Sequence, residues 1–558
     1  MKSFFFIGLL LLYGCAEGQS LPDSILKKID HLFEDGRRAN SPGYAVGIIR
    51  NDSLIFSKGY GLANLEYDLP ITPSTIFHMA SVSKQFTAYS IVLLARQGRL
   101  RLDDDIHKYL PWFPDLKEKI TVRHLLNHTS GIRDQWQLLA ISGTQLNDVI
   151  TQEHIVRILS RQRALNSKPG ERYNYCNSGY TMLAEIVKAV TGKTLRQFTD
   201  SAIFTPLGMN DTHFHDDFSE IVKGRSYSYY RADDTHYTNS ILSYSNVGAT
   251  SLFTNINDMS KWVVNFYDHK VGDQADIDQL TQKGRLNNGW ETDYALGIGV
   301  IRQKGWKGFA HDGADAGYRT VLTVFPDKKM GFLVFSNLGD ARPGEKARAV
   351  ADLFLNDTAK AGSPASPPAT DSSLRLTALK DTSAYKKFLG DYVSDERGKR
   401  MHLRIKEGKM YWDASSGTDP VIEIKDTLSL FYRPQVKMTF AIPHPGDTLL
   451  TMTYSPIDKQ EYRKYRPLQG TDQVLQTFTG SYYCPELECK YNIVLKDHQL
   501  VLTSIKYNDI PLTFEGTDHL FNNFWAMYHI MMRRNAGGKI VGFEVNADRV
   551  QHVRFDKL

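Results

Sequence analysis

Several features are scarce in this chain of 558 residues, and each absence excludes a class of protein. The 4 cysteines are too few and too scattered for a zinc framework. Cys484 and Cys489 would either close a small disulfide loop in an oxidising compartment or stay unpaired. The net charge of +5 is small, and no dense run of lysine and arginine points to a nucleic-acid partner. No stretch after the N-terminus is apolar for long enough to form a transmembrane helix.

The N-terminus is predicted to be a targeting segment, residues 1–20. A short apolar stretch, residues 4–12, lies where the hydrophobic region of a signal peptide is found. Two processing sites compete. Leu12-Tyr-Gly-Cys15 resembles the box at which bacterial lipoproteins are cut and lipidated on cysteine, whereas Ala16-Glu-Gly18 suits ordinary signal peptidase. Both predict export to the periplasm or cell envelope, and the first adds membrane attachment through a lipidated Cys15.

The pattern after the signal predicts one α+β domain, residues 21–357. Residues 44–58 and 320–335 each have the alternation and turn residues of a β-hairpin, and mostly helical patterns lie between them. Strands at both ends of a helical segment imply a single sheet that joins the two ends. Ala361–Thr370 is rich in proline, serine and alanine and has no core-forming residues, which indicates a linker, residues 358–382.

The C-terminal region contains an internal repeat. Phe388-Leu-Gly-Asp-Tyr392 matches Phe478-Thr-Gly-Ser-Tyr482 at an offset of 90 residues. Aromatic, β-branched and charged residues alternate there with frequent turns, which is typical of antiparallel sheets. Two copies of this length predict two small all-β barrels, residues 383–468 and 469–558, rather than a solenoid.

The strongest chemical signal is Ser81-Val-Ser-Lys84, which opens an apolar run, residues 86–95, predicted to form a buried helix. Residues three apart on a helix share a face, so the Lys84 amine can reach the Ser81 hydroxyl. A desolvated lysine can remove the serine proton, and the helix N-terminus favours an oxyanion. This pattern predicts serine acyl-transfer chemistry. Ser24-Ile-Leu-Lys27 fits the same tetrapeptide and is predicted to be an ordinary surface helix.

Two further motifs follow in the order that this chemistry needs. In Tyr175-Cys-Asn177, a tyrosine kept as phenolate by a nearby lysine could act as the base, and the asparagine could hold a substrate amide. In His311-Asp-Gly313, the histidine could bind a substrate carboxylate, and the glycine lets a substrate backbone lie close to the strand. Each motif also has decoys, which are interpreted as loops and a turn: Tyr237-Thr-Asn239, Tyr244-Ser-Asn246 and His444-Pro-Gly446.

A resemblance to a known family strengthens the argument. Phe77–Lys84, Ile120–Ile132 and Tyr175–Tyr180, together with the similar stretch Phe204–Met209, resemble the penicillin-recognising serine hydrolases, in particular their class C β-lactamase-like branch. The resemblance covers residues 22–356 and implies a β-lactamase-like fold for this part. With two barrels after it, the layout is similar to that of D-stereospecific aminopeptidases.

The resemblance also implies a role for each motif residue. Ser81 would be the nucleophile, Lys84 its proton partner, and Tyr175 the general base and later the acid. Asn177 would hold substrate. The backbone N–H groups of Ser81 and Ala314 would form the oxyanion hole.

The third motif departs from the family's pattern. His311 replaces the lysine of the K-T-G motif, as in esterase and peptidase members of the branch, and Asp312 stands where threonine or glycine is usual. Both departures weaken the prediction that the substrate is a β-lactam, because a lysine partner for the β-lactam carboxylate is missing. His311 and Gly313 complete the predicted substrate-binding set.

Two groups of histidines are spaced in the sequence as metal ligands often are. His124 and His128 stand four apart on a predicted helix, but no glutamate completes an H-E-x-x-H motif. Histidines and aspartates also cluster between His213 and Asp217, where a solvated loop is the preferred interpretation. We therefore predict no metal and no organic cofactor.

These observations together predict an exported serine hydrolase that acts on a small-molecule or short-peptide substrate through an acyl group on Ser81. A short peptide or amide with a D-residue is the first choice of substrate. A small ester, a β-lactam and a cell-wall D-alanyl peptide are the alternatives. A loop from one of the barrels could shape the substrate pocket. A binding or sensing protein that kept the fold and lost turnover is the alternative from a different class.

Overall fold

The computed structural model describes residues 21–38, 40–356, 382–394, 399–414, 417–424, 427–430, 436–444, 447–454, 459–465, 468, 470–515 and 518–558. The predictions for the signal segment with Cys15 and for the linker up to residue 381 lie outside these residues, as do Pro445 and Gly446 of one decoy motif. In the part of the chain that is described, no helix combines the length and apolarity needed to cross a membrane.

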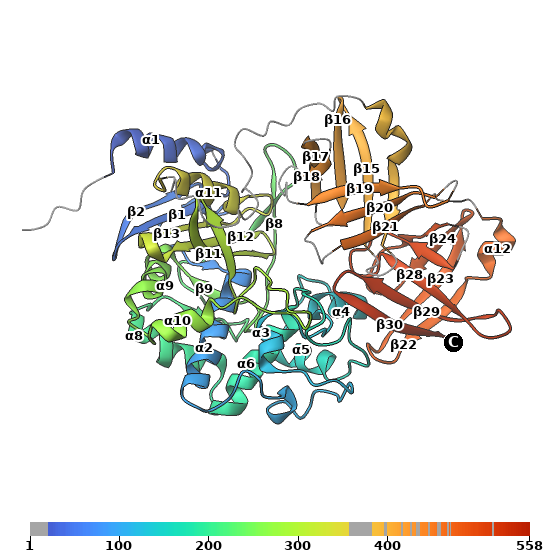
Figure 1. Ribbon diagram of the computed structural model, residues 1–558, viewed down its shortest axis with the longest axis horizontal. Coiled ribbons are helices and arrows are strands. Elements are labelled where there is room, and N and C mark those ends of the chain that lie inside the picture. Colours follow the sequence, from blue (N-terminus) through green and yellow to red (C-terminus); the bar gives the residue numbers. More distant parts are fainter. Residues whose placement is uncertain are drawn as a thin grey trace, which may run out of the picture.

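An antiparallel six-stranded sheet forms the centre of the first domain (Figure 1). The N-terminal hairpin pairs with the last strand, so the two ends of the domain meet in one sheet, as predicted. The strands in spatial order are β10 (Gly299–Gln303), β11 (Trp306–Asp315), β12 (Tyr318–Phe325), β13 (Met330–Ser336), β1 (Tyr44–Arg50) and β2 (Ser53–Tyr60).

Both faces of this sheet are covered by helices (Figure 1). Side chains alternate along β1, so Val46 packs towards α1 and α11, and Ala45 packs towards the helical region on the other face. The helices are α1 (Asp23–Leu32), α2 (Lys84–Arg96), α3 (Val122–Leu126), α4 (Gln135–Ser142), α5 (Gln152–Leu159), α6 (Asn177–Thr191), α7 (Leu195–Thr199), α8 (Thr205–Leu207), α9 (Ile256–Asp268), α10 (Gln274–Leu280) and α11 (Pro343–Asp352).

Short strands connect the helical region to the sheet. They are β3 (Leu62–Asn64) with β4 (Leu69–Pro70), β7 (Tyr229–Arg231) with β8 (Tyr237–Asn239), and a three-stranded sheet of β5 (Phe77–His78), β9 (Leu252–Thr254) and β6 (His213–Phe214). Strand β5 leads directly into the turn that carries Ser81, so this small sheet holds the start of the predicted catalytic motif in place.

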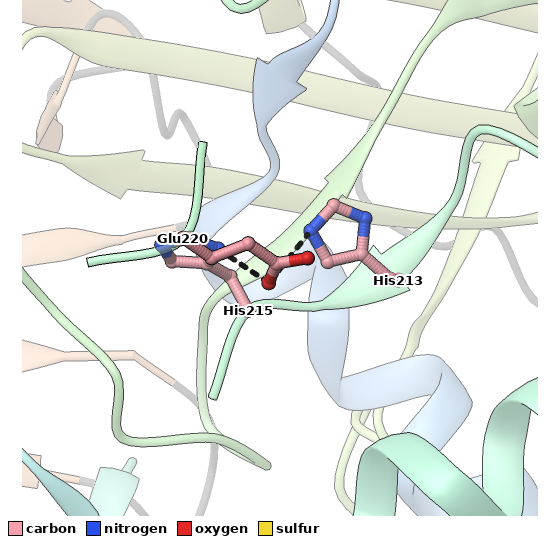
Figure 2. A group of neighbouring side chains, drawn as sticks. All are labelled: His213, His215 and Glu220. Carbon is pink, nitrogen blue, oxygen red and sulfur yellow. Dashed lines mark ion pairs between the residues drawn. The ribbon is translucent and has the colours of Figure 1, made fainter. Parts of the chain in front are cut away.

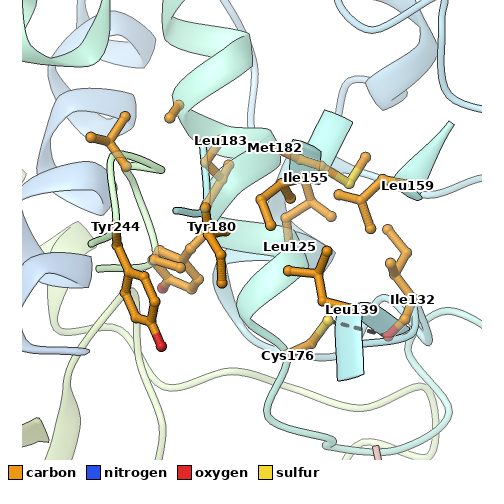
Figure 3. Packing of buried hydrophobic residues seen from close by; sticks show 14 of the residues in the cluster. Leu125, Ile132, Leu139, Ile155, Leu159, Cys176, Tyr180, Met182, Leu183 and Tyr244 are labelled. Carbon is orange, nitrogen blue, oxygen red and sulfur yellow. Dashed lines mark hydrogen bonds between the residues drawn. The ribbon is translucent and has the colours of Figure 1, made fainter. Parts of the chain in front are cut away.

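Helix α2 is the central helix of the helical region. Its residues from Lys84 to Leu94 are all buried, as the apolar run predicted for residues 86–95. Helix α6 packs against it, and the side chains around Leu125, Tyr180 and Leu183 fill the space between neighbouring helices (Figure 3). A helix that is buried on every side provides a rigid base for a side chain at its first turn.

The C-terminal region forms two all-β units, which confirms the predicted fold class. The first is a closed barrel of β14 (Gly390–Val393), β15 (Arg400–Lys406), β16 (Lys409–Ala414), β17 (Gly417–Ile424), β18 (Thr427–Leu430), β19 (Lys437–Ala441), β20 (Leu449–Thr453) and β21 (Lys459–Tyr465). The second is a nine-stranded sheet that follows the short helix α12 (Asp472–Gln476) and is nearly closed. Its strands in spatial order are β25 (Ile510–Pro511), β24 (Gln499–Thr503), β23 (Cys489–Lys496), β22 (Gly480–Cys484), β30 (Val550–Lys557), β29 (Ile540–Ala547), β28 (His529–Arg534), β27 (His519–Phe521) and β26 (Thr513–Phe514).

The repeated sequence motif builds the same local structure in both units. The Tyr392 hydroxyl donates a hydrogen bond to the Phe388 carbonyl at 2.7 Å, and the Tyr482 hydroxyl donates to the Phe478 carbonyl at 2.6 Å. The glycine between each pair has a positive φ, which other residues rarely adopt. The repeat therefore encodes a tyrosine that ties the first strand of each unit to the turn before it.

Cys484 and Cys489 are cross-strand neighbours at the ends of β22 and β23. Both are free thiols in the structure. Of the two alternatives that the sequence left open, a disulfide or two unpaired cysteines, the structure has the second.

The second unit and the helical region share one hydrophobic core. Ile141 of α4 belongs to the same buried cluster as Tyr491 of β23, whose hydroxyl donates to the Ile141 carbonyl at 3.0 Å. A buried ion pair crosses the same interface: Arg133 Nη1 lies 2.5 Å from Glu486 Oε1, and the two side chains are 0% and 5% exposed. The first barrel has its own core and contacts the second unit, for example through Arg463, which lies 2.8 Å from Glu515.

We expect Glu486→Ala to destabilise the protein by about 3–5 kcal/mol, because it leaves the Arg133 guanidinium buried without a counter-charge. Chemical denaturation followed by tryptophan fluorescence measures the change. Glu488→Ala is the matched control. Glu488 is 44% exposed and pairs at the surface with Arg157 and Arg161, where water screens the charges, so its removal should cost much less. Equal losses for the two variants would contradict the assignment of Glu486 as the buried anchor.

Candidate active site

The start of α2 brings the two residues of the first motif together. Ser81 lies in a 3-10 turn, Ala80–Ser83, that runs directly into α2, and its side chain is partly exposed. Lys84 is fully buried, and its Nζ lies 3.0 Å from Ser81 Oγ. The predicted Ser81–Lys84 contact is therefore present. The decoy Ser24–Lys27 lies in α1, on the other face of the central sheet.

The Lys84 amine also touches two oxygen atoms that can only accept hydrogen bonds. Nζ lies 2.8 Å from Asn177 Oδ1 and 2.7 Å from the Ala249 carbonyl oxygen. Burial lowers the pKa of Lys84 to about 7, although the charge of Asp315 acts in the opposite direction. A neutral amine donates its two hydrogens to these oxygens, so its lone pair faces Ser81. The geometry makes Lys84 the group that can take the serine proton.

Tyr175 lies on the other side of the serine. Its ring centroid is 4.9 Å from Lys84 Nζ, and its hydroxyl forms a hydrogen bond with Ser81. Burial raises the pKa of Tyr175 far above the ordinary value, more than this hydrogen bond and the charge of Arg549 lower it. The phenol therefore keeps its proton at neutral pH. The phenolate base expected from the sequence is not supported, since the Lys84 amine is the easier of the two groups to deprotonate.

Asn177 is the first residue of α6, and both polar atoms of its side-chain amide form hydrogen bonds. Oδ1 accepts from Lys84, and Nδ2 donates to Asp134 Oδ2 at 2.9 Å. The Asn177 backbone N–H donates to the same Asp134 oxygen at 2.8 Å. Sequence reasoning missed Asp134. The only signal available was its place before α4, where its carboxylate accepts from the Trp136 backbone as a helix cap.

Gly313 and Ala314 lie on β11 beside the nucleophile. A Cβ atom at position 313 would lie 2.3 Å from the Met79 carbonyl oxygen, so glycine is needed because the strand packs on the chain leading to Ser81. This close approach is a different use of Gly313 from the predicted one, in which a substrate backbone lay against it. Ala314 is exposed and lines the cleft described below.

His311 is a neutral side chain with both ring nitrogens engaged. Nδ1 lies 2.6 Å from the Asp312 carbonyl oxygen, which only accepts, so Nδ1 carries the proton. Nε2 then accepts from the Tyr294 hydroxyl at 2.9 Å. Burial and the nearby Lys84 charge lower the pKa of His311 to about 3. This histidine therefore offers no positive charge to a substrate carboxylate. Successive strand residues face opposite sides, and Asp312 faces Gly344 of α11.

Asp315 is a further acidic group that sequence reasoning missed. It ends β11, one residue after Ala314, and its carboxylate accepts a hydrogen bond from Thr250. Burial raises the pKa of Asp315 to about 6, so it is largely ionised at neutral pH. No motif marks this residue, because its meaning depends on the three-dimensional position of β11.

Asp134, Ala314 and Asp315 line a cleft of about 700 Å³ whose other walls come from distant parts of the chain. One wall is the turn between β29 and β30, where the Arg549 guanidinium lies 5.1 Å from the centroid of the Tyr175 ring. A turn of the second C-terminal unit therefore forms part of the cleft and contacts Tyr175. The cleft is lined by Asp134, Trp136, Gln137, Leu146, Asn147, Tyr230, Asn239, Ser240, Ile241, Tyr244, Ala314, Asp315, Ala316, Arg319, Trp525, Tyr528, Asp548 and Arg549.

Two residues of the decoy motifs belong to this lining. Tyr244 is buried and donates to the Leu146 carbonyl at 2.8 Å, and Asn239 ends β8. They form part of the wall rather than a second catalytic set.

The two groups of histidines do not lie as predicted. His128 is outside helix α3, and its Nδ1 accepts from the Cys176 backbone at 3.1 Å, while His124 caps the start of that helix. They therefore form no pair. His213 and His215 lie on or beside β6, and the second is 1% exposed, so the expected solvated loop is wrong for it.

His213, His215 and Glu220 converge in the manner of a ligand set (Figure 2). His215 Nδ1 and His213 Nε2 lie 3.6 and 4.0 Å from one oxygen of Glu220. Among the described residues, these three side chains form a group whose possible metal-ligating atoms all lie within 4.8 Å of one another. Arg196, however, donates to both Glu220 oxygens at 2.5 and 2.8 Å. Its positive charge opposes a cation at this position.

The serine, the buried lysine and the tyrosine beside a strand of an antiparallel sheet define a class of serine hydrolase. The family model described as Beta-lactamase matches residues 29–356, so the chain belongs to the beta-lactamase family. This assignment confirms the predicted resemblance and the predicted class of enzyme. The class C branch stays a prediction.

Two sequence relatives align with most of the chain. Penicillin-binding protein 4* of Bacillus subtilis (strain 168) is 25% identical over 383 residues, which cover 66% of this chain and 83% of that protein. A D-aminopeptidase of Brucella anthropi is 28% identical over 395 residues, covering 70% of each chain.

Solved structures share the fold. The octameric penicillin-binding protein homologue from Pyrococcus abyssi aligns over 87% of this chain and 98% of its own, with a TM-score of 0.54 and 21% identity. D-amino acid amidase from Ochrobactrum anthropi SV3 aligns over 59% of this chain and 98% of its own, with a TM-score of 0.51 and 20% identity.

We expect kcat/KM for any Ser81-dependent substrate to fall tenfold per pH unit below about pH 7. Protonation of Lys84 removes the lone pair that faces Ser81, so activity is present above this pKa and lost as the pH falls through it. Initial rates between pH 4 and pH 9 measure the effect.

The variant Asp315→Asn tests whether the pH dependence comes from Lys84 or from Asp315, whose pKa lies in the same range. The charge of Asp315 stabilises the Lys84 ammonium, so its removal should move the midpoint to lower pH. A pH dependence that disappears in this variant would mean that Asp315, and not Lys84, is the titrating group.

Proposed function

We propose that this protein hydrolyses the amide bond of short peptides and amides of D-amino acids that carry a free α-amino group. The D-aminopeptidase of Brucella anthropi is the relative whose printed name supports this substrate class. The observation that carries the proposal is the position of Asp315. Ala314 is the predicted oxyanion donor, and Asp315 is the next residue, with a carboxylate at the cleft.

The α-amine of a substrate is attached to the carbon next to the reacting carbonyl. A carboxylate one residue beyond the oxyanion donor is therefore well placed to bind this amine as an ammonium group. Thr250 holds one Asp315 oxygen, and the side chain remains partly exposed to the cleft. A β-lactam has no such amine at this position and requires a cation for its carboxylate, which neutral His311 does not provide.

The reaction follows from the proton positions. Lys84 takes the proton of Ser81 as Oγ attacks the carbonyl carbon, and the oxyanion accepts from the N–H groups of Ser81 and Ala314. When the C–N bond breaks, Tyr175 gives its proton to the leaving amine, and the proton held by Lys84 restores the phenol. Water then attacks the acyl group, and its proton returns to the Ser81 oxygen by way of Lys84.

The first test compares the mature protein with its Ser81→Ala variant on D- and L-alanine p-nitroanilide, p-nitrophenyl butyrate and a chromogenic cephalosporin. We expect the D-amide to be hydrolysed fastest and Ser81→Ala to be inactive. The variant should keep its melting temperature, because the hydroxyl is partly exposed and fills little of the core. Turnover of the ester alone would indicate an esterase, and no turnover at all would favour the binding protein.

A second test addresses Asp315 directly. Asp315→Asn should reduce kcat/KM for D-alanine p-nitroanilide by about 10- to 100-fold, which corresponds to losing a charged hydrogen bond of about 1.5–3 kcal/mol. The same variant should lose little or no activity on the N-acetylated substrate, which has no ammonium group. Rates are compared at the pH plateau of each protein. An equal loss on both substrates would show that Asp315 does not bind the amine.

A further inference from the structure

We infer that Arg549 binds an anionic group on the leaving side of the substrate. The preferred substrate is then a short D-peptide that ends in a free α-carboxylate, one residue beyond the bond that is cut. This inference rests on the proposed function and narrows it from amides in general to dipeptide-like substrates with both termini free.

The Arg549 side chain is a cation whose charge is not neutralised by a direct partner. Among the residues that the structure describes, no carboxylate lies within 4.0 Å of its guanidinium. Asp548, the neighbouring acid, is already bound by Lys399 at 2.9 Å. The guanidinium instead lies over the face of Tyr175, where the aromatic ring attracts a positive charge. Its five N–H groups leave it well suited to a carboxylate in the cleft.

The backbone of the turn fixes where this side chain lies. The Arg549 N–H donates to Gln137 Oε1 at 3.0 Å. Its carbonyl oxygen accepts from the Asp134 backbone at 3.1 Å and from Asn166 Nδ2 at 2.7 Å. These three bonds involve only main-chain atoms of Arg549. A substitution at this position therefore removes the guanidinium and keeps the turn attached to the helical region.

The position of Tyr175 identifies the part of the substrate that Arg549 faces. Tyr175 is the predicted proton donor to the leaving nitrogen, so this nitrogen must come close to its hydroxyl. In a peptide the carboxylate of the last residue is two bonds from that nitrogen. A guanidinium beside the Tyr175 ring is within reach of this carboxylate, whereas Asp315 serves the amine on the acyl side.

The other charges at the cleft do not replace Arg549. Arg319 is the second cation in the lining, but its Nη1 donates to the backbone carbonyls of Ala316 and Tyr318 at 2.9 and 2.7 Å. Asp134 faces Arg549 from the helical region and is itself held by Asn177. Its charge attracts the guanidinium without pairing with it directly. Arg549 is therefore the group that discriminates between charged and neutral leaving residues.

The test compares D-alanyl-D-alanine with its C-terminal N-methylamide, with release of D-alanine and of its methylamide measured by chromatography. The ratio of the two kcat/KM values removes any effect of Arg549 on Tyr175 that the two substrates share. We expect the wild type to prefer the free carboxylate by about 10- to 100-fold, the equivalent of a charged hydrogen bond. Arg549→Gln should bring the ratio close to one, and Arg549→Lys should restore part of it.

Arg319→Gln is the matched control, because it removes a cation of the same cleft whose Nη1 already donates to two backbone carbonyl groups. Its ratio should equal that of the wild type. A ratio unchanged by Arg549→Gln would overturn the inference, even if both rates fell. Failure of the proposed function would look different, because D-alanine p-nitroanilide, which has no carboxylate, would then not be hydrolysed by the wild type either.

Discussion

The burial of one amine is the constraint on which the rest of the site depends. Lys84 sits in the first turn of a helix that is buried on every side, and desolvation there favours its neutral form. The Asn177 amide and the Ala249 carbonyl take the two hydrogens of that neutral form. Asp134 in turn orients Asn177. Each neighbour thus contributes to directing a single lone pair at the nucleophile.

Burial away from water also gives Lys84 and Tyr175, the two groups beside Ser81, different roles. It brings the pKa of an amine down and the pKa of a phenol up, so Lys84 loses its proton readily and Tyr175 keeps its own. One environment therefore yields a base and an acid at the same pH. Two groups of the same charge type could not be separated in this way.

Local spacing in the sequence predicted the Ser81–Lys84 contact and the shared sheet, and the resemblance to a family predicted the fold of the first domain. Ser81 and Lys84 are three apart on one helix, and the hairpins at both ends of the first domain imply their shared sheet. The sequence could not indicate Asp315 or Arg549. Asp315 gains its role from the strand beside Ser81, and Arg549 from a docked turn of another unit. The role of Gly313 was also hidden, because the crowding at its Cβ comes from Met79, far away in the sequence.

The turn between β29 and β30 has a consequence for how the protein matures. Arg549 follows Ser81, Lys84 and Tyr175 in the sequence and is therefore synthesised after them, yet it stands beside the tyrosine of the site. The first domain can acquire these three residues while its cleft still lacks one wall. That wall forms only when the hairpin of β29 and β30 has folded and docked. A chain without this hairpin would retain the nucleophile beside a cleft that is open on one side.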